Sequence, residues 1–173
     1  MKAIFSFKVI LLFFCIIFIS SRLTAQDMGK PQPVDNETLK MLMGTWKSDP
    51  YDFMDAKWTE TAIHSMKLNG QYLVIEVSAV SDKSQTYNGT IYITPDKDGN
   101  WKGVEFDEWG GITPMTGKAN GNKITSTSKS DYGSETREIE INGNTMIHNI
   151  SMSMKGKDGA DIPMKLMVTY HKQ

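Results

Sequence analysis

The stretch that decides the fold is MLMGTWKSD, residues 41–49. It completes a short apolar pattern, because Leu39, Leu42 and Met43 follow the i, i+3, i+4 spacing of one helix face. Gly44 ends that pattern, since glycine is unfavourable inside a helix and suits its C-terminal end. Trp46 follows two residues later. We therefore predict a short helix over residues 35–43 that leads directly into a first strand over residues 44–48.

Beyond residue 48 the sequence shows no helical period of useful length and is divided by turn sequences instead. They recur at roughly 8 to 12 residues, a spacing typical of all-β folds. These turns lie at residues 68–71, 95–100, 119–122, 141–144 and 155–159. Several contain Asn-Gly, which tight hairpins favour because both central residues need a positive φ.

Between the turns, apolar and polar residues alternate with a period of two, as in half-buried strands. The predicted strands cover residues 44–48, 58–68, 72–80, 89–94, 101–106, 112–117, 123–128, 137–141, 146–154 and 162–170. Hairpin spacing without crossover helices indicates an antiparallel meander, and closing a long meander leaves no open edge. The predicted fold is therefore all-β: about ten strands closed into a barrel, with a short N-terminal helix.

The first 25 residues have the order of a secretory signal peptide. Lys2 and Lys8 precede or flank an apolar run over residues 9–19, and small and polar residues follow up to Ala25. The run is short for a membrane span, which needs about 20 residues. We predict a signal peptide at 1–25, a disordered leader at 26–34 and one domain at 35–173. The mature protein is then periplasmic or extracellular, without membrane insertion.

Composition excludes several classes of function. Removing residues 1–25 takes away three basic residues and no acidic one, so the formal charge of −1 becomes about −4. No basic block remains, so nucleic acid is not an expected partner. Cys15 is the single cysteine and falls in the signal segment, which leaves the mature chain without thiol chemistry or disulfides.

The helix followed by Gly44-x-Trp46 resembles the start of the lipocalin-like, or calycin, barrels. The resemblance implies that Trp46 packs across the closed end of a barrel and that the helix plugs it, so Gly44 and Trp46 are predicted to be structural. Further motifs resemble a family of exported bacterial domains of unknown function with that fold, over nearly all of residues 36–173. These motifs are Leu39-x-x-Leu42-x-Gly-Thr-Trp46, Trp58-x-Glu60, Leu68-x-Gly70-x-Tyr72-Leu73 and Tyr87-x-Gly89.

Alternation also predicts which side chains line the interior, because residues two apart on a strand share a face. Apolar rows that include histidines occur on the strands at 58–68 and 146–154, and another apolar row on the strand at 162–170. We predict that the protein binds one small apolar or amphipathic molecule, with side chains that pack and orient it. The predicted ligand-binding residues, all expected to face inward, are Trp58, His64, Met66, Val104, Phe106, His148, Met152, Met164 and Tyr170.

Two alternatives remain open. His148 is a candidate haem or metal ligand, because the chain resembles nitrobindin barrels, in which a late-strand histidine holds haem iron. Those barrels begin with Gly-x-Trp-x-Gly-x-Gly, whereas Lys47 to Asp49 follow Trp46 here. No other cofactor is expected. The third hypothesis is a structural or interaction domain with a filled interior.

Enzymatic activity is the least supported class. The densest acidic patch is VEFDEWGG, residues 104–111, in which Glu105 and Asp107 share a strand face. Two carboxylates on one face suit acid–base chemistry. A solvated strand end leading into a Gly-Gly loop explains the same pattern, and no serine-nucleophile motif is present. We predict no catalytic residues.

Overall fold

The computed structural model describes residues 35–96, 98–156 and 158–173. The chain divides into two compact units, Met1–Pro31 and Gln32–Gln173, and the described residues all belong to the second. The predicted signal peptide and leader, residues 1–34, lie outside the described residues.

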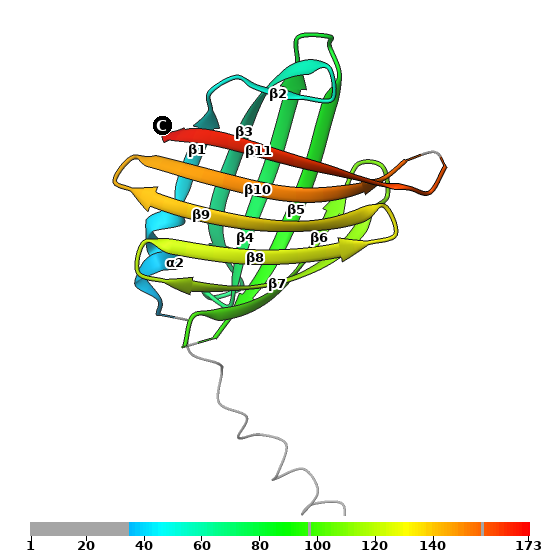
Figure 1. Cartoon of the computed structure of the whole chain (residues 1–173). Coiled ribbons are helices and arrows are strands. Elements are labelled where there is room, and N and C mark those ends of the chain that lie inside the picture. Colours follow the sequence, from blue (N-terminus) through cyan, green and yellow to red (C-terminus); the bar gives the residue numbers. More distant parts are fainter. Residues whose placement is uncertain (1–34, 97, 157) are drawn as a thin grey trace, which may run out of the picture. The chain divides into compact units, whose positions relative to one another are not determined.

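The described unit is almost entirely β-structure (Figure 1). Its elements are α2 (Glu37–Leu42), β1 (Gly44–Ser48), β2 (Tyr51–Phe53), β3 (Ala56–Lys67), β4 (Tyr72–Ser81), β5 (Thr86–Pro95), β6 (Asn100–Asp107), β7 (Ile112–Asn120), β8 (Lys123–Ser130), β9 (Gly133–Asn142), β10 (Thr145–Lys155) and β11 (Asp161–Lys172). Within the described residues, no helix is long and apolar enough to cross a membrane.

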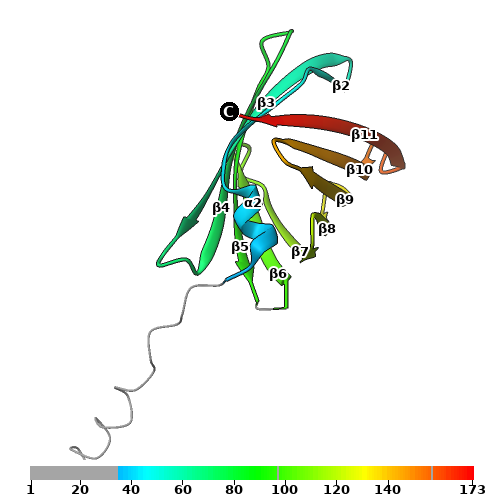
Figure 2. The ribbon, with the colours of Figure 1, turned by 90° about the vertical axis from the view of Figure 1, so that its left-hand side faces the viewer.

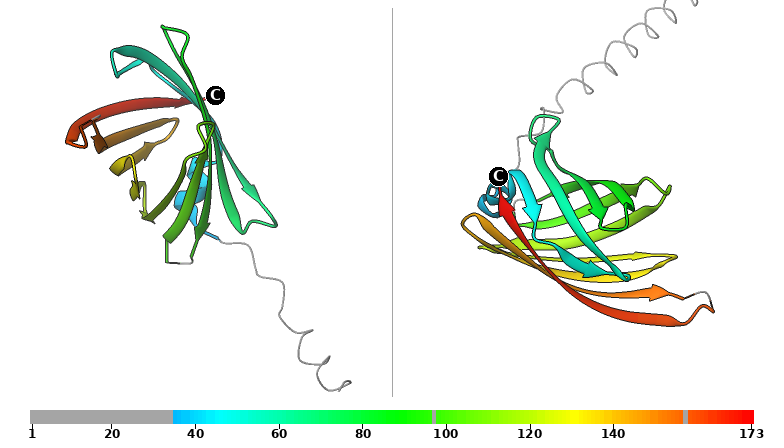
Figure 3. Two further views of the ribbon diagram at one scale, coloured as in Figure 1. Left: turned by 90° about the vertical axis from the view of Figure 1, so that its right-hand side faces the viewer. Right: turned by 90° about the horizontal axis from the view of Figure 1, so that it is seen from above.

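The strands close into a barrel. From β3 to β11 each strand pairs antiparallel with the next, and β1 joins the two ends by pairing with both β3 and β11. The ring therefore has ten strands, while β2 extends β3 as a short hairpin outside it. The predicted ten-stranded antiparallel barrel with a short N-terminal helix is confirmed. Figures 1 and 3 show β3–β6 and β7–β11 as two walls whose strands cross steeply.

The closing seam is short. β1 pairs with β11 only from Trp46 to Ser48, opposite Lys172 to Tyr170. From Asp161 to Thr169, β11 has a partner strand on one side alone, namely β10. Pro163, which lacks a backbone donor, and the charged Lys165 lie in this stretch, and such residues protect strand edges from further pairing.

One end of the barrel is closed by α2. Asn36 caps the helix by accepting a hydrogen bond from the Leu39 amide at 3.1 Å. Thr38 donates its hydroxyl to the Gly121 carbonyl in the β7–β8 turn at 2.6 Å, which fixes the helix against the strand ends. Figure 2 shows α2 between the two walls.

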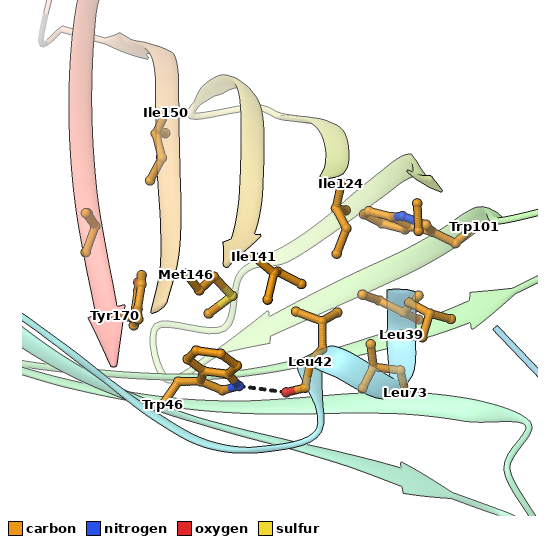
Figure 4. Close-up of a cluster of buried hydrophobic side chains, with 13 residues drawn as sticks. Leu39, Leu42, Trp46, Leu73, Trp101, Ile124, Ile141, Met146, Ile150 and Tyr170 are labelled. Atoms are coloured by element: carbon orange, nitrogen blue, oxygen red, sulfur yellow. Dashed lines mark hydrogen bonds between the residues drawn. The ribbon is translucent and has the colours of Figure 1, made fainter. Parts of the chain in front are cut away.

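Trp46 lies at the centre of this closed end with no exposed surface. Its indole nitrogen donates to the Leu42 carbonyl at 2.7 Å, so the first strand is tied to the last turn of α2 (Figure 4). Gly44, with a φ of 114°, makes this bend, and a Cβ there would lie 3.1 Å from the Lys172 side chain. Inward side chains from eight strands, β4 to β11, complete the cluster: Leu73, Ile93, Trp101, Ala119, Ile124, Ile141, Met146, Ile150, Val168 and Tyr170.

Burial along the inward face falls from this closed end to the other. On β7 the inward residue Ala119 is buried, whereas Met115 and Thr113 are half-buried. On β9 the inward residue Ile141 is buried, whereas Arg137 and Glu135 are half-buried. Solvent therefore reaches the interior at the end that holds the turns at residues 82–85, 108–111 and 131–132. We call this the open end.

Candidate functional site

Polar side chains gather on the inward face toward the open end. They form a set that we call the inner polar cluster: Tyr51, Glu60, Tyr87, Glu105, Glu135, Arg137, His148 and Tyr170. They come from β2, β3, β5, β6, β9, β10 and β11, so the closed ring brings together residues far apart in sequence.

Glu60 is held by two phenols. Tyr170 donates to Oε1 at 2.8 Å and Tyr51 donates to Oε2 at 3.3 Å. The backbone amide of Glu60 donates to the Ser48 hydroxyl at 2.8 Å, which ties β3 to β1 at this point. Burial raises the pKa of Glu60 above its usual value, and the hydrogen bond from Tyr170 offsets part of that rise.

Arg137 is paired with Glu135, its neighbour on the same face of β9. The guanidinium donates from Nε to Oε1 at 2.8 Å and from Nη2 to Oε2 at 3.2 Å, a two-point contact. The two side chains remain 28% and 24% exposed. Burial lowers the pKa of Arg137, but Glu135, together with smaller contributions from Tyr170 and Glu60, more than reverses this, so the net shift is upward and the guanidinium stays charged.

His148 lies beside Arg137 and is 6% exposed. Arg137 Nη1 approaches its Nδ1 at 3.5 Å, and because arginine only donates, this contact favours the tautomer with the proton on Nε2. The His148 ring lies 4.6 Å from the Tyr170 ring. Burial, followed by the charge of Arg137, lowers the pKa of His148 well below its usual value, so the ring is neutral. Nε2 is buried without a hydrogen-bond partner.

Glu105 forms the opposite side of the cluster. Tyr87 donates its hydroxyl to Glu105 Oε1 at 2.6 Å. The Tyr87 ring lies over Gly89, where a Cβ would come within 2.9 Å of the phenol oxygen, so glycine makes room for the tyrosine. Trp109 stands edge-on to Tyr87 with ring centroids 5.4 Å apart.

The three carboxylates of the acidic patch at residues 104–111 have different surroundings. Glu105 faces inward, as described. Asp107 accepts the amides of Trp109 and Gly111, both at 2.9 Å, and so shapes the β6–β7 turn. Glu108 accepts from the Asn88 side chain at 2.8 Å on the exposed surface. Two of the three carboxylates are therefore explained by local structure.

An aromatic wall flanks the cluster on β2, β3 and β5. Trp58 is largely buried and donates its indole N–H to the Phe53 carbonyl at 3.1 Å. Tyr51 pairs with Trp58 across the β2–β3 hairpin, and Tyr87 packs against the same group. Tyr51, Phe53 and Tyr87 pack against this buried group and remain partly exposed themselves.

The structure places most of the sequence-predicted site residues on the inward face, but spread over the length of the barrel. His64 and Met66 lie toward the closed end, and His64 is buried. Met152 and Met164 pair across β10 and β11 and are half-buried. Trp58 belongs to the aromatic wall, and His148 and Tyr170 belong to the inner polar cluster. Their binding of a ligand remains a prediction.

Val104 and Phe106 are corrections, because both face outward. Trp101 and Glu105 occupy the inward positions of β6, and alternation then turns residues 104 and 106 to the outer face. Phe106 is 43% exposed and stacks edge-on against Tyr92 at 6.2 Å. It lines a shallow hollow on the outer surface together with Ile63, Thr90, Glu76 and Glu108.

Sequence reasoning missed the charged part of the cluster. Arg137 and Glu135 share the inward parity of Ile139 and Ile141, and Glu60 shares that of Trp58 and Ala62. A charged residue on an otherwise apolar strand face was the available signal. Tyr51 gave no signal, since β2 is only three residues long.

The residues around His148 do not fit a haem or metal as placed. Nε2, the atom that would bind iron, is buried, and Nδ1 faces a guanidinium. Among the described residues, no three His, Cys, Asp or Glu side chains are grouped so that they could hold a metal ion.

Comparison with known proteins supports the fold. No family model matches the chain. No curated protein matches it either. Among solved structures, it is similar to the crystal structure of Rv2717c from M. tuberculosis, with a TM-score of 0.62 and 14% sequence identity over 79% of this chain and 96% of that one. At that identity the similarity shows the β-barrel fold alone.

Proposed function

We propose that the protein binds a small amphipathic molecule inside the open end of the barrel. The observation that carries this proposal is the gradient along the inward face, from buried apolar side chains at α2 to half-buried polar ones at the other end. Barrels of this size hold at most one small ligand. Ligand sites are typically concave and mostly apolar, with a few convergent polar groups.

The two kinds of surface have different tasks in this proposal. Met152, Met164 and Leu166 on β10 and β11 offer flexible apolar contact, since methionine adapts to varied shapes. The inner polar cluster fixes the orientation of the ligand's polar group. A filled interior describes the closed end well, but it does not explain why the inward residues of β7, β8 and β9 stay half-exposed farther along.

We also propose that the barrel is of the lipocalin-like kind and that the protein acts outside the cytoplasm. The order of a short helix, Gly44 and a buried Trp46 supports the first part. The charged, apolar and small-residue order of residues 1–25 supports the second.

The test uses two methionines of one strand that lie on opposite faces. Met164 faces inward, whereas Met167 faces outward and is 65% exposed. The neutral fluorophore N-phenyl-1-naphthylamine serves as the probe, because its emission rises in apolar surroundings. We expect M164K to weaken probe binding by about tenfold or more, since a charge enters an apolar contact, while M167K leaves it unchanged. Equal effects of both changes, or no binding by the wild type, would overturn the proposal.

A further inference from the structure

We propose that the ligand carries an organic ammonium group, bound between the carboxylates of Glu60 and Glu105 and the ring faces of the aromatic wall. This inference rests on the proposed binding function and names the chemical class of the ligand. It follows from three features of the open end. These are its negative charge, its partly exposed aromatic side chains, and the pairing of Arg137, the one cation described on this part of the inward face, with Glu135.

The inward face near the open end is negatively charged. Among the described residues, its charged groups are Glu60, Glu105, Asp107, Glu135 and Arg137. Glu135 pairs with Arg137 through two hydrogen bonds, so most of the guanidinium's donors near the site are used, although its charge still reaches Glu60. No described lysine or arginine lies within ion-pair distance of Glu60 or Glu105. A recess of one sign attracts ligands of the opposite sign.

Both carboxylates keep capacity for a ligand. Each carboxylate has about four acceptor positions. Glu60 receives two phenol hydrogen bonds and Glu105 receives one, so acceptor positions remain on each. Burial is the largest cause of the raised pKa of Glu60; the charge of Arg137 lowers this pKa, and repulsion from Glu105 adds a smaller rise. An ammonium group would relieve that repulsion.

The aromatic wall supplies the second, independent element. Tyr51, Trp58 and Tyr87 line the same part of the interior as the carboxylates, and Trp109 extends the aromatic surface at the rim. Cations bind the faces of such rings, and quaternary ammonium groups are recognised in this way. Both phenols are turned toward carboxylates, and both rings pack against the Trp58 cluster but stay partly exposed, so the exposed ring carbons of Tyr51 and Tyr87 are available to a ligand.

An inorganic cation fits less well. Divalent ions need several oxygen ligands at once, and the described residues offer no group of three carboxylate or histidine side chains so placed. An ammonium group on an apolar body uses all three surfaces: the carboxylates, the aromatic faces and the methionines of β10 and β11.

The experiment compares three ligands with the same tail, namely decyltrimethylammonium, decanol and decanoate, each below its micelle concentration. They compete for the full mature chain with N-phenyl-1-naphthylamine. We expect decyltrimethylammonium to displace the probe at about tenfold lower concentration than decanoate, because the carboxylates and ring faces attract its cation whereas the carboxylates repel decanoate; tenfold corresponds to about 1.4 kcal/mol. In E60Q and in E105Q the preference should fall severalfold. E76Q, on the outer face of β4, should leave it unchanged.

The outcomes separate the two proposals. If none of the compounds and not even the probe binds, the proposed function fails. If decanoate or decanol competes as well as decyltrimethylammonium, or if E105Q retains the full preference, the barrel still binds small molecules and the ammonium assignment is overturned. E105Q decides this even if E60Q does not fold, because Glu105 is half-exposed and holds a single phenol.

Discussion

The two ends of the barrel are built from the same strands, yet they differ in almost every physical property. At the closed end Trp46, Leu73 and Met146 have no exposed surface, and their neighbours are nearly all apolar. On β9, a few residues beyond the buried Ile141, Arg137 and Glu135 are charged and remain partly exposed. The change occurs without any break in strand pairing. Regular β-structure thus carries a stability core and a polar recess on one inward face.

The difference assigns separate tasks to the two ends. Burial of large apolar side chains is the dominant favourable term in folding, so the closed end should carry most of the stability. The open end buries charges that are costly to desolvate, and it keeps them in hydrogen-bonded sets. Substitutions should therefore affect stability most at the closed end and ligand binding most at the open end.

The largest effect expected is that of W46A. Removing a buried tryptophan costs about 3–5 kcal/mol of unfolding free energy, and this change also removes the hydrogen bond to Leu42. Urea denaturation measures it. W109A is the matched control at the open end, where the indole is 74% exposed, and we expect a change within about 0.5 kcal/mol. Similar costs for both variants would break the contrast between the ends.

Acid should weaken the closed end through His64. Burial, and then Lys172, lowers its pKa to about 4, against an ordinary value of 6.5. Between these values the unfolded chain binds a proton that the folded chain does not, so stability falls as pH falls through this window. The shift is worth about 3 kcal/mol when complete. Glu60 acts in the opposite direction, because its raised pKa makes protonation favourable in the folded state.

The measurement for His64 is therefore a difference. Unfolding free energies of the wild type and H64L are compared from pH 7 to pH 4, so that the contribution of Glu60 cancels. H64L should lose less stability on acidification than the wild type. Parallel curves for the two proteins would show that His64 is not held neutral by burial.

A smaller effect is expected where the two ends meet. Y170F removes the 2.8 Å hydrogen bond to Glu60 from a residue with almost no exposed surface. The expected loss is about 1–2 kcal/mol, because a charged acceptor loses one buried donor. Y51F, whose bond to the same carboxylate is 3.3 Å and half-buried, is the control and should cost less. A reversed order in thermal denaturation would place the main support of Glu60 on β2.

The smallest effect is expected for H148L. Its Nε2 has no partner and its Nδ1 makes only a 3.5 Å contact with Arg137, which keeps both of its bonds to Glu135. Stability should change by less than about 1 kcal/mol in either direction. The same variant tests the haem hypothesis, since a haem-dependent absorption band in the wild type that H148L abolishes would revive it. A loss of several kcal/mol would show that His148 holds the inner polar cluster together.

The barrel itself could be predicted from sequence because its signals are local. Alternation marks most of the strands, and the Asn-Gly turns at residues 69–70, 120–121 and 142–143 mark three of the hairpins. The hairpin between β2 and β3 was missed because its turn uses Met54 and Asp55 at positive φ instead of glycine. The turn at residues 131–132, likewise without Asn-Gly, moved the predicted strand ends inward by a few residues.

The site was harder to predict because two signals disagree there about which side chains face inward: the apolar character of single residues and the alternation along the strand. Val104 and Phe106 were placed inward for being apolar, although Glu105 between them is the residue that the interior uses. The partner that makes an inward glutamate acceptable, Tyr87, lies on the preceding strand, 18 residues earlier, and can be identified only once the register is known. The same holds for Arg137. An arginine on the inward face is tolerated because Glu135 pairs with it, and the inward face is defined only once the barrel has closed.

The short seam at β1 has a consequence for folding kinetics. Nearly all the other strand pairs are hairpins with small sequence separation, whereas Asp49 and His171 meet across 122 positions. Closing a loop of that length costs roughly 4 kcal/mol of chain entropy, and within the sheet β1 and β11 share only three residue pairs. Pairs of high contact order form late. We therefore expect the hairpins to form first and the pairing of β1 with β11, which closes the barrel, to form last. In hydrogen exchange, the amides of β1 should then show the lowest free energy of opening among the strands of the barrel.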